Sequence, residues 1–263
     1  MRNVFRNISL CMLLVLSVEL VAQENYWHQE PREIHYQPNG NAFELVHGNR
    51  KFNRALYGTN TGFRVEAGDL PEFAMYMPGM GGNFQLGISS DKKSKWITEA
   101  NHIKTSYIPG RMEYSIEDEI LQGGKLHLQI LALADDEGFI LQVIPENIPA
   151  EVDLIWVYGG ASGKKFHRDG DIGADPESVF YLQPDYCEHN DFEITKNTFQ
   201  LDYAWDAKNK ETRKMMTGVF PDAEVKLADV HQLENPLNLW NSTAEELPVL
   251  VGKINDLNAE LYW

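Results

Sequence analysis

The stretch from Lys125 to Ala134 reads K-L-H-L-Q-I-L-A-L-A and favours a β-strand. Its apolar residues alternate, so one face of an extended chain carries Leu126, Leu128, Ile130 and Ala132. A polar turn, Asp135-Asp136-Glu137-Gly138, follows, and the apolar run Phe139 to Ile144 then returns. Because period-two burial and an Asp/Gly turn agree, the segment predicts an antiparallel hairpin with one buried face.

Short strands and turns extend from this hairpin in both directions. Pro109-Gly110 is a natural turn between two apolar runs. We expect strands over 42–46, 52–57, 62–65, 73–77, 83–88, 103–108, 111–116, 155–158, 179–182, 192–195, 198–203, 212–220, 225–228 and 247–254. Only 229–235 and 242–246 have room for a helical turn or two. The pattern predicts a mainly β fold in which two antiparallel sheets pack face to face as a β-sandwich.

The first 23 residues are typical of a secretory signal peptide. Arg2 and Arg6 form a positive segment, an apolar core runs from Ile8 to Leu16, and Val21-Ala22-Gln23 precedes polar residues. This core is too short for a comfortable membrane span. We therefore expect the remaining chain, 24–263, to be periplasmic or secreted and not inserted in a membrane. It has the length of one large domain.

Charge and cysteine content narrow the classes of partner. The formal net charge is −16, and an acidic excess of this size repels phosphate backbones, so nucleic acid is a poor partner. Neutral ligands such as sugars are left open. Removal of Cys11 with the signal leaves Cys187 without a disulfide partner, and we expect it as a half-buried strand thiol.

The best site candidate is the loop that follows the apolar run Val152 to Val157. From Gly159 it reads G-G-A-S-G-K-K-F-H-R-D-G-D-I-G-A-D-P-E, ending at Glu177. Glycines allow close backbone approach to a ligand, and glycoside hydrolysis needs two carboxyl groups. The candidate catalytic residues are Asp169, Asp171, Asp175 and Glu177. The candidate substrate-binding residues are Lys165, His167 and Arg168, with Trp156 and Trp27 as aromatic platforms.

Other interpretations of these residues stay open. Gly, Asp and Pro also make up ordinary surface connections, the cations could pair with the acids and simply order the loop, and large aromatic residues in a sandwich are mostly core. The acids could instead bind calcium, although their spacing does not match an EF-hand. The histidines lack zinc-site spacing. We expect no metal and no other cofactor, with calcium as the alternative. A second glycine-rich stretch, Pro78 to Asn83, could line the same cleft or form a wide turn.

Three stretches carry a resemblance to a known family. They are W-H-Q-E-P-R-E-I-H-Y-Q-P-N-G from Trp27, F-N-R-A-L-Y-G-T-N-T-G-F-R-V-E-A-G-D-L-P-E-F-A-M-Y-M-P-G-M-G-G-N from Phe52, and the loop from Gly159. Together they resemble the amino-terminal part of the domain-of-unknown-function family 4450, large exported proteins of Bacteroidota. Such proteins resemble six-hairpin glycosidases, in which a β-supersandwich precedes an (α/α)6 barrel.

The resemblance implies a role for the chain. It would be the N-terminal, supersandwich-like domain of a glycosidase-like exported protein, would contribute to glycan binding and would dock against a helical barrel that carries most of the catalytic carboxylates. From the aromatic, apolar segment Asp256 to Trp263 we expect a chain truncated before that barrel. The alternatives are a free-standing, non-catalytic carbohydrate-binding module and a glycosidase complete within the sandwich.

Overall fold

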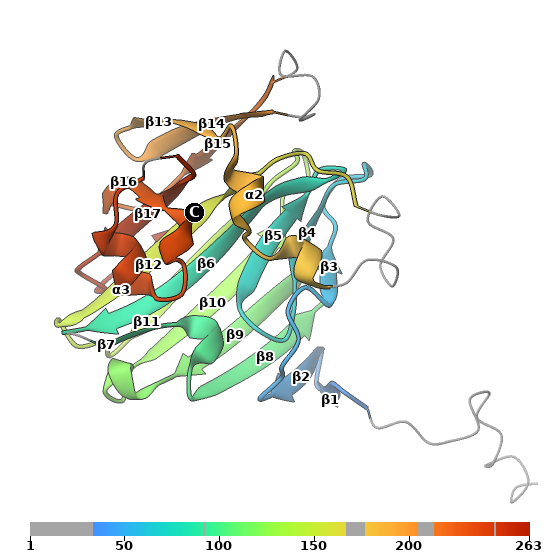
Figure 1. Ribbon diagram of the computed structural model, residues 1–263. Helices are drawn as coiled ribbons and strands as arrows, with labels where there is room; N and C mark the ends of the chain where they lie inside the picture. The colour runs from blue at the N-terminus through green and yellow to red at the C-terminus, as the bar shows by residue number, and fades with distance from the viewer. Residues whose placement is uncertain (1–33, 92, 167–176, 205–212, 245) are drawn as a thin grey trace, which may run out of the picture. The chain divides into compact units, whose positions relative to one another are not determined.

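A computed structural model describes residues 34–91, 93–166, 177–204, 213–244 and 246–263. Residues Tyr36–Trp263 form one compact unit, and the description below concerns that unit. Its described part is mainly β and sandwich-like, as the sequence predicted, but it has three antiparallel sheets and not two (Figure 1). The signal-peptide prediction for 1–23 lies outside the described residues. No helix among the described residues is long and apolar enough to cross a membrane.

The first large sheet has seven strands and contains the predicted hairpin. Lys125 pairs with Glu146 and Ala132 with Phe139, so the period-two pattern gives the register. The alternate apolar residues of this strand are buried, as predicted. In spatial order the strands are β1 (Gln37–Asn39), β2 (Ala42–Val46), β8 (His102–Ile108), β9 (Arg111–Glu117), β10 (Lys125–Ala132), β11 (Phe139–Glu146) and β18 (Leu261–Tyr262).

The second large sheet has eight strands, and two long ones, β12 and β6, lie next to each other near its middle. In spatial order its strands are β16 (Glu224–Asp229), β17 (Pro248–Ile254), β12 (Val152–Ala161), β6 (Met80–Ser90), β5 (Glu72–Tyr76), β4 (Arg64–Ala67) and β3 (Arg54–Leu56), and β7 (Lys93–Trp96) also pairs with β6. The third, smaller sheet consists of β13 (Asp191–Thr195), β14 (Thr198–Ala204) and β15 (Arg213–Val219).

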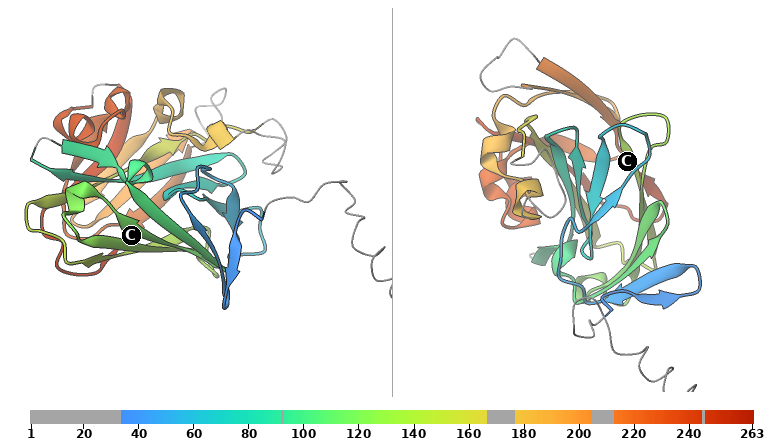
Figure 2. Two further views of the ribbon diagram at one scale, coloured as in Figure 1. Left: turned by 90° about the horizontal axis from the view of Figure 1, so that it is seen from below. Right: turned by 90° about the vertical axis from the view of Figure 1, so that its right-hand side faces the viewer.

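The core lies between the two large sheets, which are stacked as layers (Figure 2). Trp156 on β12 packs at its centre, with ring centroids 6.2 Å from Phe84 and 5.4 Å from Phe220. Burying each large apolar side chain contributes about 1.5–3 kcal/mol. The chain end adds to this layer, because β18 pairs with β11 and the Trp263 ring lies 5.7 Å from that of Phe84.

Short helical segments cover the outer face of the eight-stranded sheet (Figure 1). Ile155 and Val157 face this cover, while Leu154 and Trp156 face the core, so the apolar run Val152 to Val157 is buried on both sides. The segments are η3 (Glu177–Phe180), α2 (Pro184–Cys187), η4 (Val230–Gln232) and α3 (Pro236–Asn241). Two further short segments, η1 (Ile97–Glu99) and η2 (Glu119–Leu121), instead add their apolar residues to the core.

Three local predictions were wrong. Residues 179–182, expected as a strand, begin in η3 and pack Phe180 against Phe52. The helical turn expected at 242–246 lies earlier, because Asn235 caps α3 through the backbone N–H groups of Leu237 and Asn238, and Pro236 occupies the first helical position. Cys187 is fully buried at the end of α2 and is not a half-buried strand residue.

Candidate functional site

The two glycine-rich stretches of the sequence lie side by side. Strand β12 and the start of β6 are neighbours, so the loop after Ala161 leaves the sheet beside the β5–β6 turn. The N–H groups of Ser162 and Gly163 donate to the Met80 carbonyl at 3.1 and 3.0 Å, and the Met80 N–H donates to Lys164 O at 3.1 Å. Gly79 has φ +119°, and a Cβ there would lie 2.7 Å from Gly163 O. Only glycine permits this close approach.

The far end of the predicted site loop is held by a buried polar cluster on the sheet. The Glu177 carboxylate accepts a hydrogen bond from the Lys51 N–H at 3.2 Å. Lys51 Nζ lies 2.5 Å from the Glu72 carboxylate. The Asn83 amide donates both to Glu72 Oε1 at 2.8 Å and to the Phe180 carbonyl at 2.9 Å. Asn83 thus ties η3 to the sheet.

Glu66 on β4 joins the same face as Glu72 on β5. Glu66 lies opposite Ala74, two residues along β5 from Glu72. Burial raises the pKa of Glu66 to about 7, against the lowering effect of Arg64, with which it pairs. The two carboxyl groups are 2% and 1% exposed. They are a buried structural pair in this arrangement and do not form an open acid/base site.

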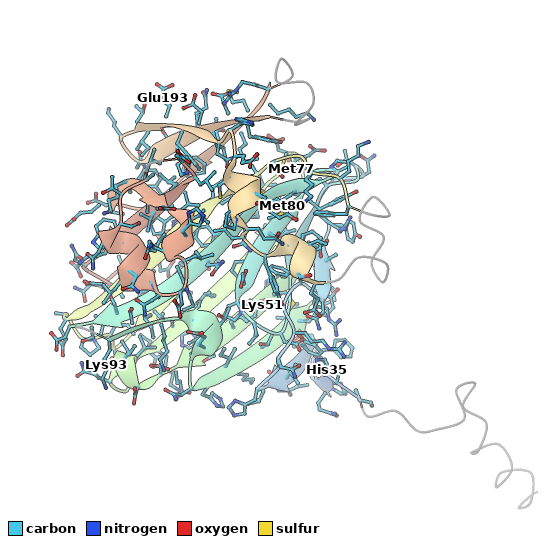
Figure 3. All side chains as sticks on the ribbon, viewed as in Figure 1. His35, Lys51, Met77, Met80, Lys93 and Glu193 are labelled. Atoms are coloured by element: carbon cyan, nitrogen blue, oxygen red, sulfur yellow. The ribbon has the colours of Figure 1, made fainter. Side chains whose placement is uncertain are left out.

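Aromatic rings seal this cluster on the side of the loop. The Phe166 ring lies 5.7 Å from that of Tyr76 and 5.0 Å from that of Phe180, and the Arg64 guanidinium stacks 3.9 Å from the Tyr76 centroid. Such packing excludes water and strengthens the ion pairs beneath it. The described ends of the loop are therefore ordered by the sheet. Lys51 of this cluster is labelled in Figure 3, as is Met80 at the start of β6.

The predicted site residues are placed as follows. Glu177 lies against Lys51, and Lys165 is exposed next to the buried Phe166. Trp156 is a correction to the predicted aromatic platform, because its side chain is completely buried in the core and offers no ring face to solvent. The candidates outside the described residues are Trp27, His167, Arg168, Asp169, Asp171 and Asp175.

A cleft of about 890 Å³ lies elsewhere, where the three-stranded sheet meets the core and the β10–β11 loop. Its apolar lining includes the partly buried Phe139 and Phe199 and the buried Phe84. Its polar lining includes the hydroxyl or amide groups of Thr195, Thr198, Gln200 and Thr217. In the sequence these residues look like parts of ordinary strands and a turn. Their only local signal was the acidic turn before Phe139.

Two indole N–H groups of this cleft lack an acceptor. Trp156 and Trp263 line the cleft, and the Nε1 atom of each is buried with no hydrogen-bond partner among the described residues. A buried donor without an acceptor is uncommon in native structures. A Cβ on Gly252 would lie 2.2 Å from Trp156 Nε1, so of these two donors Trp263 is the candidate for a ligand oxygen. The indole of Trp96, outside the cleft, instead donates to Leu233 O at 2.8 Å.

Carboxylates are the charged groups of the described cleft lining. They are Asp136 and Glu137 on the β10–β11 loop and Glu193 on β13, and all three are exposed. Figure 3 labels Glu193 on the three-stranded sheet. No set of three or more potential metal ligands occurs among the described residues. Of the four acids considered for calcium, Glu177 is the one that the structure describes.

These features define an antiparallel β-sandwich with a polar-edged, aromatic cleft. The model of one family matches residues 77–263, and the chain belongs to that family, the domain of unknown function DUF4450. The match includes both glycine-rich stretches and all of the described cleft lining except Met75. No curated protein matches the chain.

Proposed function

We propose that this chain is the β-sandwich domain of an exported, glycosidase-like protein, that its cleft holds part of a glycan, and that it docks against a helical barrel. The Bacteroidota proteins that the sequence resembles, and the six-hairpin glycosidases that these resemble in turn, support the proposal by analogy. The enzyme's acid/base carboxylates would then lie mainly on the barrel.

The observation that carries the glycan part of the proposal is an aromatic, polar-edged cleft whose lining includes Trp263, an indole without an acceptor among the described residues. Sugar hydroxyl and ring oxygens are acceptors, and the C–H faces of pyranose rings pack on aromatic side chains. Thr195 and Thr217 add hydroxyl groups to the lining, of the kind that orient a polar ligand. The Thr198 hydroxyl and the Gln200 amide already donate to Thr195 O and Asp202 at 2.7 and 2.8 Å. The cleft volume of about 890 Å³ is that of an ordinary small-ligand site.

An exposed apolar patch on the seven-stranded sheet supports the docking part. Leu131 and Ile140 are direct partners in the β10–β11 register, and Tyr262 lies opposite Gln142 on the next strand. They are 36%, 40% and 48% exposed. The Tyr262 ring is held in place by its hydroxyl, which donates to Glu260 at 2.6 Å. Grouped apolar side chains on an exposed face are typical of interaction surfaces.

Glycan-array binding by the purified protein tests the proposal. Trp263→Phe removes one indole N–H and keeps an aromatic ring, so we expect affinity for the bound glycan to fall roughly fivefold. The matched control is Trp96→Phe, which removes an indole that already has an acceptor and lies outside the cleft. An equal loss in both variants, or no binding to any glycan, would contradict a role for the cleft.

The same preparation separates the alternatives. Glycan binding without turnover favours a carbohydrate-binding role, either in a larger protein or as a free-standing module. Hydrolysis that is abolished by Asp169→Ala, Asp171→Ala or Asp175→Ala would place the chemistry in the loop from Gly159 and would establish an enzyme complete within the sandwich.

A further inference from the structure

The charge of the cleft bears on which glycans it would accept. Three carboxylates, Asp136, Glu137 and Glu193, belong to its described lining, and no lysine, arginine or histidine does. Acidic glycans need cationic partners, and uncompensated carboxylates repel them. The charge of the described lining therefore favours cationic ligands and disfavours acidic ones.

The three carboxylates are available to a ligand. Each residue is exposed, and no ion pair joins any of them to a basic side chain of the described residues. The Asp136 carboxylate accepts a hydrogen bond from the Glu137 N–H at 2.8 Å, which fixes that carboxylate on the turn. The turn begins after Leu133, whose N–H donates to Gly138 O at 2.9 Å, so the acids are carried by a closed β-hairpin loop.

The three acids come from two different sheets, and this placement further restricts which ligands would fit the cleft. Asp136 and Glu137 come from the seven-stranded sheet, whereas Glu193 comes from β13 of the three-stranded sheet, in register with Gln200 and, through it, Thr217. Trp263, whose buried indole N–H has no acceptor among the described residues, belongs to the same lining. A ligand of this cleft would present an oxygen acceptor to that indole and a cation to the carboxylates.

We propose that the cleft selects glycans that carry a protonated amino group, such as glucosamine-containing oligosaccharides, and disfavours uronate or sulfated glycans. This inference rests on the proposed glycan-binding function. A primary ammonium supplies three hydrogen-bond donors and a positive charge, and charge-assisted hydrogen bonds to carboxylates are stronger than neutral ones. The formal net charge of −16 adds a long-range attraction for such ligands and repels acidic ones.

Calorimetric titration of the purified protein with three probes tests the inference. The probes are the glucosamine hexamer, the N-acetylglucosamine hexamer and an oligogalacturonate, at a mildly acidic pH at which the sugar amines are protonated. We expect the glucosamine hexamer to bind roughly three- to tenfold more tightly than its acetylated form at low salt. Oligogalacturonate should bind most weakly. The advantage should shrink between about 20 mM and about 200 mM NaCl.

Two double variants separate the effect of the cleft carboxylates from that of the protein's overall negative charge. Glu137→Gln with Glu193→Gln should remove most of the preference for glucosamine. Glu99→Gln with Glu246→Gln removes the same charge at exposed positions outside the cleft and should leave the preference unchanged. Equal affinities for the two hexamers, or an equal loss in both double variants, overturns the charge selectivity and leaves the glycan-binding proposal standing. If no glycan binds, both proposals fail.

Discussion

Arg64 forms an ion pair with Glu66 two residues further along β4, and both side chains are buried on the outer face of the eight-stranded sheet. A period-two pattern normally places such residues in solvent. Here η3, α2 and the ends of the loop from Gly159 cover that face, so the charges lie under aromatic rings. Burial raises the pKa of Glu66 to about 7 even beside the guanidinium.

The raised pKa of Glu66 predicts a pH-dependent stability. Its carboxyl has an ordinary value of 4.5 in the unfolded chain and about 7 in the folded one, so the folded state binds the proton more tightly. The resulting stabilisation is complete below about pH 4.5 and is lost as the pH rises to about 7. It amounts to about 3 kcal/mol.

Urea unfolding of Glu66→Gln across this pH range measures the effect. The variant should lose most of the fall in the free energy of unfolding between mildly acidic and neutral pH. Glu99→Gln, at an exposed position, should keep the wild-type profile. Identical pH profiles for Glu66→Gln and the wild type would show that Glu66 does not titrate in this range.

The strands were largely predictable because their signals are local. The segment K-L-H-L-Q-I-L-A carries its own period and turn, and β10 and β11 follow it. Strand β7, K-S-K-W, was missed because it is short and polar and forms by pairing with β6. Residues 179–182 look like a strand by composition, but their aromatic side chains serve to pack a short helix onto Phe52.

The site was only partly predictable. The loop from Gly159 has a dense local signal in glycine and charge, and the second glycine-rich stretch does lie beside it. The groups that hold its far end come from distant parts of the chain; Asn83 and Phe180 are 97 residues apart. The described lining of the cleft comes from six separate segments between Met75 and Trp263, so no window of sequence contains it.

The ion pair between Lys51 and Glu72 predicts a large loss on removing one partner. The Glu72 side chain is 1% exposed, so Lys51→Met leaves a buried carboxylate without its cation. We expect the free energy of unfolding to fall by roughly 3 kcal/mol. Adding Glu72→Gln should restore part of this loss. Lys125→Met breaks an exposed pair with Glu117 and should have a far smaller effect. Equal losses at the two sites would argue against a buried charge.

Burial of Cys187 predicts an unreactive thiol. Burial raises its pKa to about 12, and the residue is 0% exposed. Because the thiolate is the reactive form, alkylation in native buffer should be at least about a hundredfold slower than in urea. Cys11→Ser makes Cys187 the single thiol in the experiment. Fast native labelling would mean that α2 opens readily from β12.

The contact between Gly252 and Trp156 predicts a position that tolerates no side chain. The two residues are partners in the β12–β17 register, and a Cβ on Gly252 would lie 2.2 Å from two atoms of the indole. The ring is fully buried among Phe84, Phe220 and Trp263, so it has no room to withdraw. Gly252→Ala should therefore destabilise the protein by about 3 kcal/mol through overpacking.

Thermal and urea unfolding of three variants test this assignment. Gly62→Ala is the matched control, since a Cβ there meets only Pro78 Cγ at 3.6 Å, and it should change the free energy of unfolding by less than about 0.5 kcal/mol. Trp156→Phe removes the part of the ring that would collide, so Gly252→Ala should cost clearly less in the Trp156→Phe background than in the wild type. Strict additivity of the two substitutions would show that the cost of Gly252→Ala arises from the backbone and not from the indole.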